Sequence, residues 1–133
     1  MYAEAPSPSD VEAFEYLLGA SVISQAVLGP DTDRRVYFEP ARKCEAHLFL
    51  DPDTGVALRT KPRRESSSYL FADELVEIAQ GRPHLLTLVF DQSVARGSEL
   101  HQLDAKLSAL AAGSMDWRTC PMLASYSSRA TAA

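Results

Sequence analysis

The chain has 133 residues, of which 46% are hydrophobic and 23% are charged, and its formal net charge is −5 at pH 7. This length and composition are typical of one globular domain, and they exclude a disordered chain, a fibrous repeat and a small scaffold held by disulfides. The acidic balance argues against a protein that coats nucleic acid, although a local basic patch is compatible with it.

The compartment is predicted from features that the sequence lacks. The start MYAEAPSPSD has no basic segment followed by an apolar one, and the longest apolar run is too short to cross a bilayer. The two cysteines, Cys44 and Cys120, are far apart and make no disulfide framework. We therefore expect a cytoplasmic protein with reduced thiols and no membrane contact.

The first predicted element is a helix in SPSDVEAFEYLLGASVISQAVLGP, residues 7–30. Ser9 and Glu12 form a capping-box pattern, apolar side chains recur on one face, and the Gly-Pro pair at the end stops the helix. Gly19 lies inside this stretch and lowers its helix propensity. The pattern thus predicts one long helix, in which Gly19 is the place for a kink.

The period of the apolar residues then changes from about four to two. Residues 43–50 and 56–61 each alternate between apolar and polar side chains, and Asp-Pro-Asp-Thr-Gly between them is rich in turn residues. This pattern predicts an antiparallel hairpin. With residues 35–39 as an earlier strand of the same sheet, one face would carry cations with aromatic rings among them. That face consists of Arg35, Tyr37, Glu45, His47, Phe49, Arg59 and Lys61.

The second half of the chain predicts two more helices around a strand. Residues 66–83 read as a helix that ends at Gly81, or as a strand at 68–71 followed by a helix from Asp73. Residues 84–90 are apolar throughout, as expected of a central strand covered on both faces. A leucine stripe predicts the last helix, within residues 95–113. The stripe consists of Leu100, Leu103, Leu107 and Leu110.

Together these elements predict a single α+β domain with a mostly antiparallel sheet and three helices packed mainly on one face. The sheet would have about four strands: the hairpin 43–50/56–61, together with 35–39 and 84–90. We expect the domain to span residues 9–123, with Trp117 to Leu123 packed on it, between flexible tails at residues 1–8 and 124–133.

One candidate binding site is the basic and aromatic sheet face. Residues 34–64 hold eight of the thirteen lysines and arginines. Cations interleaved with stacking rings are how sequence-tolerant binders hold single-stranded nucleic acid. A solvated sheet face has the same pattern, and an excess of arginine over lysine is also typical of a GC-rich, bacterial-like genome. Nucleic-acid binding is therefore one hypothesis, with ordinary solvation as its alternative.

A second candidate is an anion site at Arg96-Gly97-Ser98, because free amides at a helix N-terminus beside an arginine attract anions. Gly97 as a turn residue and Ser98 as a helix cap explain the same string without a ligand. For metal binding, Cys44 and His47 are three apart on a predicted strand and hence on opposite faces. We expect no metal or other cofactor, and no residue is assigned a catalytic role.

These observations favour a small protein-interaction or regulatory module, such as an adaptor or chaperone-like protein, over an enzyme. In element order and acidity the chain resembles small secretion chaperones, which dimerise and hold an unfolded segment, but it has only one clear strand between its last two helices. A protein partner or a homodimer would require an exposed apolar patch or strand edge, expected at 35–39 or around Trp117 to Leu123. Single-strand nucleic-acid binding and a small enzyme or anion-binding domain are the alternatives.

Overall fold

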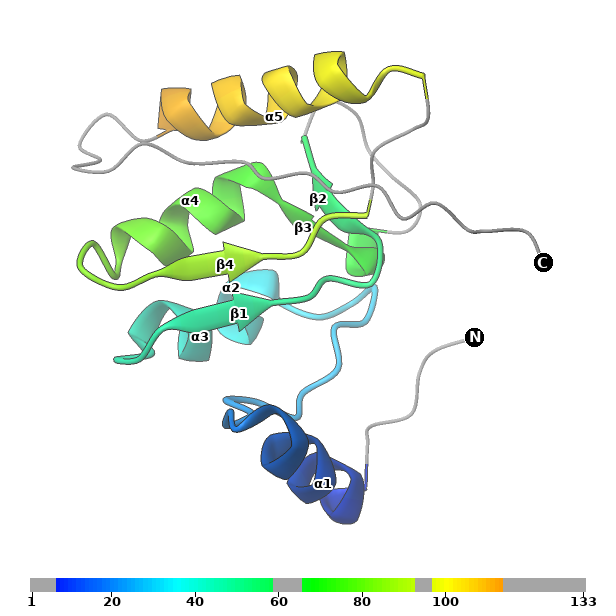
Figure 1. The fold of residues 1–133 in the computed structure, drawn as a ribbon, viewed down its shortest axis with the longest axis vertical. Helices are drawn as coiled ribbons and strands as arrows, with labels where there is room; N and C mark the ends of the chain where they lie inside the picture. The colour runs from blue at the N-terminus through cyan, green and yellow to red at the C-terminus, as the bar shows by residue number, and fades with distance from the viewer. Residues whose placement is uncertain (1–6, 59–65, 93–96, 114–133) are drawn as a thin grey trace.

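The computed structural model of the chain describes residues 7–58, 66–92 and 97–113, and its elements are arranged as Figure 1 shows. The helices are α1 (Pro8–Leu18), α2 (Arg34–Tyr37), α3 (Glu39–Lys43), α4 (Ala72–Gln80) and α5 (Glu99–Gly113), with a 3₁₀ turn, η1, at Ser66–Ser68. The strands are β1 (Leu48–Leu50), β2 (Gly55–Ala57), β3 (Tyr69–Phe71) and β4 (Thr87–Val89). Most of the residues expected to form flexible tails, and the segment Trp117 to Leu123, lie outside the described residues.

The protein is α+β, but its strands pair differently from the prediction. In the described part of the chain there are two sheets of two strands each, and both are parallel: β1 pairs with β4, and β2 pairs with β3. The predicted antiparallel hairpin of 43–50 and 56–61 is therefore wrong, and so is the four-stranded antiparallel sheet. The alternating pattern marks which side chains share a face, but it does not say which strand will be the neighbour.

The predicted strand at 35–39 is also wrong, because this stretch is helical. The Asp33 carboxylate accepts hydrogen bonds from the backbone N–H groups of Arg35 (2.9 Å) and Val36 (3.3 Å), and so caps the start of α2. Pro40 lies in the first turn of α3, a position that proline favours. These two local signals outweigh a period-two pattern that is only five residues long.

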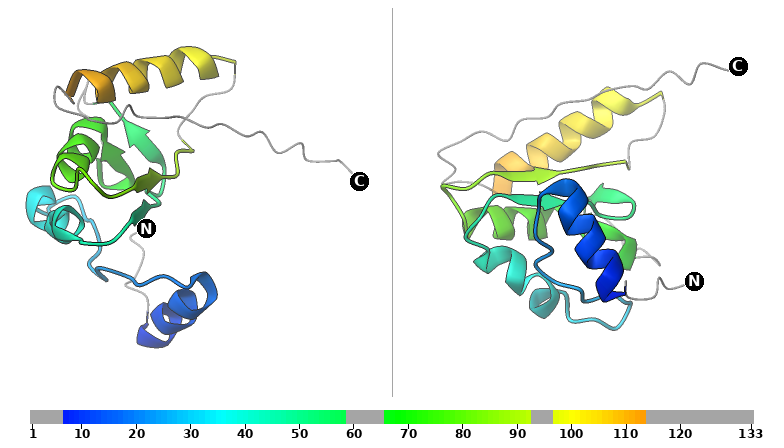
Figure 2. Two further views of the ribbon diagram at one scale, coloured as in Figure 1. Left: turned by 60° about the vertical axis from the view of Figure 1, so that its left-hand side comes forward. Right: turned by 60° about the horizontal axis from the view of Figure 1, so that its bottom comes forward.

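Helix α1 is shorter than predicted. The Ser7 and Asp10 side chains form the capping box in place of Ser9 and Glu12, and Gly19 adopts φ 60° and ends the helix. The chain then turns back, and the Val22 N–H donates a 2.6 Å hydrogen bond to Glu15 Oε1. Figure 1 and the left view of Figure 2 show α1 standing apart from the sheets and the other helices.

The other two predicted helices are found at nearly the expected places. The alternative in which a strand precedes the helix is confirmed by β3 and α4, and Gly81 is the C-cap of α4. α5 packs against α4, but Leu100 of its predicted stripe is exposed. No helix in the described ranges combines the length and the apolar character needed to cross a membrane.

The main core lies between α4 and the strands, with Ile78 fully buried at its centre. Arg34 of α2 crosses to this core: its Nε–H and Nη2–H groups donate to the Glu74 carboxylate at 2.6 and 2.8 Å, and Nη2 also donates to the Tyr69 carbonyl. The guanidinium lies over the rings of Phe38 and Phe71. This ion pair ties α2, β3 and α4 together.

A second buried ion pair joins α5 to the end of β4. Lys106 Nζ lies 2.5 Å from Asp91 Oδ2, and Asp91 Oδ1 accepts a hydrogen bond from the Val56 N–H at 3.1 Å. One aspartate thus connects α5 and β2. The strand predicted at 84–90 pairs with β1, and its link to β2 is the hydrogen bond between Asp91 and Val56.

Candidate functional site

The outer face of the β1/β4 sheet carries apolar side chains that nothing in the described ranges covers. Phe49 of β1 pairs in register with Leu88 of β4, and each is 55% exposed. Leu86 lies two residues before Leu88, hence on the same face of the strand, and is 61% exposed. We call Phe49, Leu86 and Leu88 the apolar face. An exposed cluster of large apolar side chains is typical of a binding surface.

The opposite face of the same sheet holds the apolar face in position. Leu48 is buried in the core, and Leu50 and Val89 pack against it. Arg82 fastens the entry to both strands, because Nε donates to the Cys44 carbonyl (2.7 Å), Nη2 donates to the Ala46 carbonyl, and Nη1 donates to Thr87 Oγ1 (2.9 Å). Arg82 is itself only 4% exposed. The sheet is thus a rigid support for the side chains on its outer face.

The outer edge of β1 pairs with no strand of the described residues. The parallel ladder uses the backbone groups of Leu48 and Leu50, since Leu48 N–H donates to the Leu86 carbonyl and Phe90 N–H donates to the Leu50 carbonyl. Backbone groups of the residue between them point the other way. Neither the N–H nor the carbonyl of Phe49 has a hydrogen-bond partner within the described residues. An unpaired strand edge of this kind is a template for another strand.

Two of the predicted site residues, His47 and Phe49, lie at this sheet. His47 directly precedes β1, and its Nδ1 accepts a hydrogen bond from the Leu86 N–H at 3.0 Å. Arg35 and Tyr37 belong to α2 and not to a strand. Phe38, which follows α2, is in the core with Leu48, so α2 packs on the side of β1 opposite to Phe49. The structure does not bring these four residues onto one face.

Of the remaining predicted site residues, the structure describes Gly97 and Ser98. Arg59, Lys61 and Arg96 lie outside the described residues. Gly97 has φ 87°, and its N–H donates to Glu99 Oε2 at 2.8 Å, so a carboxylate of the chain already occupies that amide. Ser98 Oγ accepts from Gln102 Nε2 at 2.5 Å. The contacts of Gly97 and Ser98 are those expected of a turn and a helix start.

Several basic residues of the 34–64 stretch form ion pairs within the fold. Arg34 pairs with Glu74, Arg42 Nη1 lies 3.9 Å from Glu77 Oε2, and Lys43 Nζ lies 2.5 Å from Glu39 Oε1. The hydrogen bond and the charge of Lys43 lower the pKa of the Glu39 carboxyl. These ion pairs give several basic residues of the 34–64 stretch a structural role in holding α2, α3 and α4. No ligand is needed to account for them.

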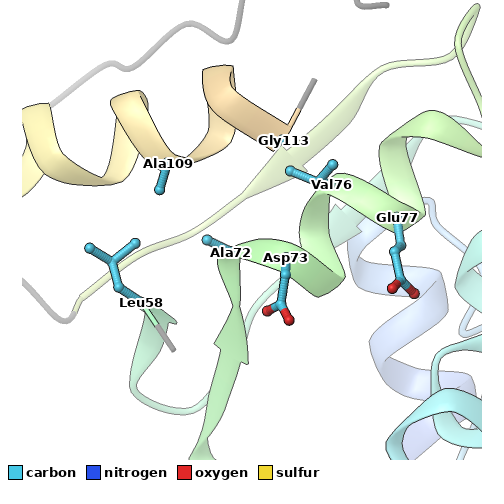
Figure 3. Close-up of a pocket in the computed structure, with 7 residues that line it drawn as sticks. All are labelled: Leu58, Ala72, Asp73, Val76, Glu77, Ala109 and Gly113. Carbon is cyan, nitrogen blue, oxygen red and sulfur yellow. The ribbon is translucent and has the colours of Figure 1, made fainter. Parts of the chain in front are cut away.

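An open cavity of about 490 Å³ lies between α4 and α5. Figure 3 shows Leu58, Ala72, Val76 and Ala109 lining the space between the helices, while the carboxylates of Asp73 and Glu77 point away from α5. Gly113 closes one end, and a Cβ there would meet Val76 Cγ2 at 3.0 Å. The described lining contains no histidine, cysteine or cation, and its two carboxylates are directed away from the space between the helices.

Helix α1 carries a second exposed apolar surface. Phe14, Tyr16, Leu17 and Leu18 are all exposed, and Tyr16 is 92% exposed. A shallow cavity of about 410 Å³ separates α1 from residues 22–27. Three acidic residues, Asp10, Glu12 and Glu15, accompany it. Because α1 stands apart from the sheets and the other helices, it lacks the rigid support that the core gives to the β1/β4 sheet.

Within the ranges described, no group of three or more histidine, cysteine, aspartate and glutamate side chains is placed to hold a metal ion. Cys44 is a free thiol whose Sγ lies 3.7 Å from the Ala46 carbonyl oxygen.

Sequence reasoning missed Leu86 and Leu88, because the apolar run 84–90 was interpreted as a strand covered on both faces. No signal within the run separates a strand covered on both faces from one covered on a single face.

Comparisons with known proteins add no assignment. No family model, no curated protein and no solved structure matches this chain. The functional proposal therefore depends on the geometry of the described residues.

Proposed function

We propose that this protein is a non-enzymatic interaction module that binds a protein partner through the apolar face of the β1/β4 sheet. The observation that carries the proposal is the exposure of Phe49, Leu86 and Leu88 on one side of a sheet whose other side is buried in the core. Since these three side chains are 55–61% exposed, completing their burial in a partner would recover about 1 to 2 kcal/mol each.

The partner predicted by this surface is a protein with a complementary apolar patch. Among the described residues the β1/β4 face carries no row of cations of the kind that nucleic-acid binding requires, since Arg35 lies on α2 and the cations Arg42 and Lys43 are ion-paired. We therefore keep protein binding as the leading function and nucleic-acid binding as an alternative.

The test is capture of the partner by tagged full-length protein from nuclease-treated extracts of its own cells, with identification by mass spectrometry and binding of the purified partner. Leu88→Asp should abolish binding, because it places a charge at the centre of the apolar face. Leu100→Asp is the matched control, since Leu100 is an exposed leucine on α5 and away from this face. Equal binding by both variants would overturn the proposal.

A further inference from the structure

We infer that two copies of this chain associate through the outer edge of β1, in an antiparallel pair centred on Phe49. This inference rests on the proposed function and deepens it, because such a pair would place the apolar faces of the two copies side by side as one larger binding surface. The resulting sheet would have the strand order β4, β1, β1 of the second copy and β4 of the second copy.

The first support is the hydrogen-bonding pattern of the edge. The backbone N–H and carbonyl groups of Phe49 point outward. The same alternation, continued one residue beyond each end of β1, would put those of His47 and Asp51 on this edge in the dimer. None of these groups has a hydrogen-bond partner within the described residues. In an antiparallel pair centred on Phe49, each copy donates to and accepts from the other at all three positions.

The second support is the complementarity of the side chains in that register. Phe49 lies opposite Phe49 of the second copy, and His47 lies opposite Asp51 of the second copy, twice by symmetry. Since Nδ1 of His47 accepts from the Leu86 N–H, the ring proton is on Nε2, where it can be donated to an acceptor. On the other face Leu48 meets Leu50. Every cross-strand pair is therefore apolar with apolar or donor with acceptor.

Other registers of the same edge are worse. A shift by two residues in one direction puts Glu45 opposite Asp51, and a shift in the other direction puts Phe49 opposite Asp51. Like charges face each other in the first case, and a carboxylate faces an aromatic ring in the second. The sequence around Phe49 thus favours one self-complementary register over its neighbours.

The test is a charge exchange measured by sedimentation velocity over a wide range of concentrations. His47→Asp places two carboxylates opposite each other, and Asp51→Lys places a histidine opposite a lysine. Each variant alone should self-associate about tenfold more weakly than the wild type, because two unfavourable pairs replace two favourable ones. An equimolar mixture of the two variants should recover association, since the introduced carboxylate then faces the introduced ammonium. Asp104→Lys, an exposed charge reversal on α5, should leave association unchanged.

The outcomes separate this inference from the proposed function. A wild type that stays monomeric at every concentration overturns the inference, as does a mixture that associates no better than its components. If the wild type is monomeric while Leu88→Asp still abolishes partner binding, the inference fails and the proposed function stands. If the mixture recovers association while Leu88→Asp leaves partner binding intact, the proposed function fails and the dimer stands. Circular dichroism of each variant checks that the fold is retained.

Discussion

The two sheets of this protein have the same number of strands and the same parallel pairing, yet they differ in burial. In the β2/β3 sheet, Val56, Ala57, Leu70 and Phe71 are all buried. In the β1/β4 sheet only Leu48 is buried, and Phe49 and Leu88 face away from the core. The difference shows that the β2/β3 sheet belongs to the core. The β1/β4 sheet, in contrast, presents an apolar surface that no other described residue covers.

In each sheet, one arginine from outside the strands donates hydrogen bonds that hold the strands in place. Arg34 holds β3 through the Tyr69 carbonyl and Glu74, and Arg82 holds the entry to β1 and β4 through the Cys44 and Ala46 carbonyls. Arg34 has a carboxylate partner, and Arg82 is satisfied by carbonyl and hydroxyl oxygens. The effects of substitution should therefore differ.

The largest effect is expected at the arginine of the buried sheet. Arg34→Ala should lower the free energy of unfolding by about 4 kcal/mol, because it leaves the Glu74 carboxylate without its guanidinium and removes the contacts with two rings. Urea denaturation measures this change. The neighbouring Arg35→Ala is the matched control, since Arg35 is exposed, and it should change stability by less than about 0.5 kcal/mol. Equal effects at both positions would contradict this account of Arg34.

The same substitution in the two sheets compares their burial directly. Leu70→Ala should cost about 3 kcal/mol, because Leu70 is 2% exposed and its removal leaves a cavity. Leu88→Ala should cost less than about 0.5 kcal/mol. Thermal and urea unfolding of both variants provide the measurement. A loss at Leu88 as large as that at Leu70 would mean that the apolar face is part of the core.

The arginine of the exposed sheet should give a smaller effect than Arg34. Arg82→Lys keeps the charge but cannot donate to three oxygens with the geometry of a guanidinium, so we expect a loss of about 2 kcal/mol. Partner binding should weaken in parallel, because the support of the apolar face loosens. Unfolding and binding measured on the same preparation test both parts, and a variant with full stability and full binding would contradict the role assigned to Arg82.

A smaller loss of stability than at Arg82 is expected at the contact between α5 and α4. Gly113→Ala brings a Cβ to 3.0 Å from Val76 Cγ2, so the Val76 side chain must give by a few tenths of an ångström, which we expect to cost about 1 kcal/mol. The paired substitution Val76→Ala makes room for the new methyl group. A double-mutant cycle should show coupling between the two positions, and additive effects would show that they do not touch.

The sequence predicted helices better than strand partners, and the reason is physical. α4 and α5 were predicted because helical periodicity and caps are local, and Gly81 ends α4 as expected. The pairing of β1 with β4 joins residues about 40 positions apart, such as Leu48 and Thr87. The sequence around Leu48 contains no local signal that identifies Thr87 as its partner. The hairpin prediction paired each strand with its nearest neighbour in the sequence. In the structure β2 instead pairs with β3, and the Val56 N–H of β2 donates to Asp91.

The candidate site was predictable only in part. His47 and Phe49 were assigned to one face by alternation, and both lie at the β1/β4 sheet. Arg35 and Tyr37 were grouped with them because the Asp33 cap was overlooked, although an aspartate before RRVY is a local signal of a helix start. The exposure of Leu86 and Leu88 depends on which helices cover the sheet, and that follows from the tertiary packing alone.

Hydrogen exchange of the full-length protein, with and without its captured partner, tests the central claim most directly. The account predicts slower amide exchange on binding at residues 47–51 and 86–90, while residues 55–57 and 69–71 change little because they are already buried. Protection confined to α1 or to the α4/α5 cavity, with no change at the β1/β4 sheet, would contradict the claim that this sheet is the binding surface.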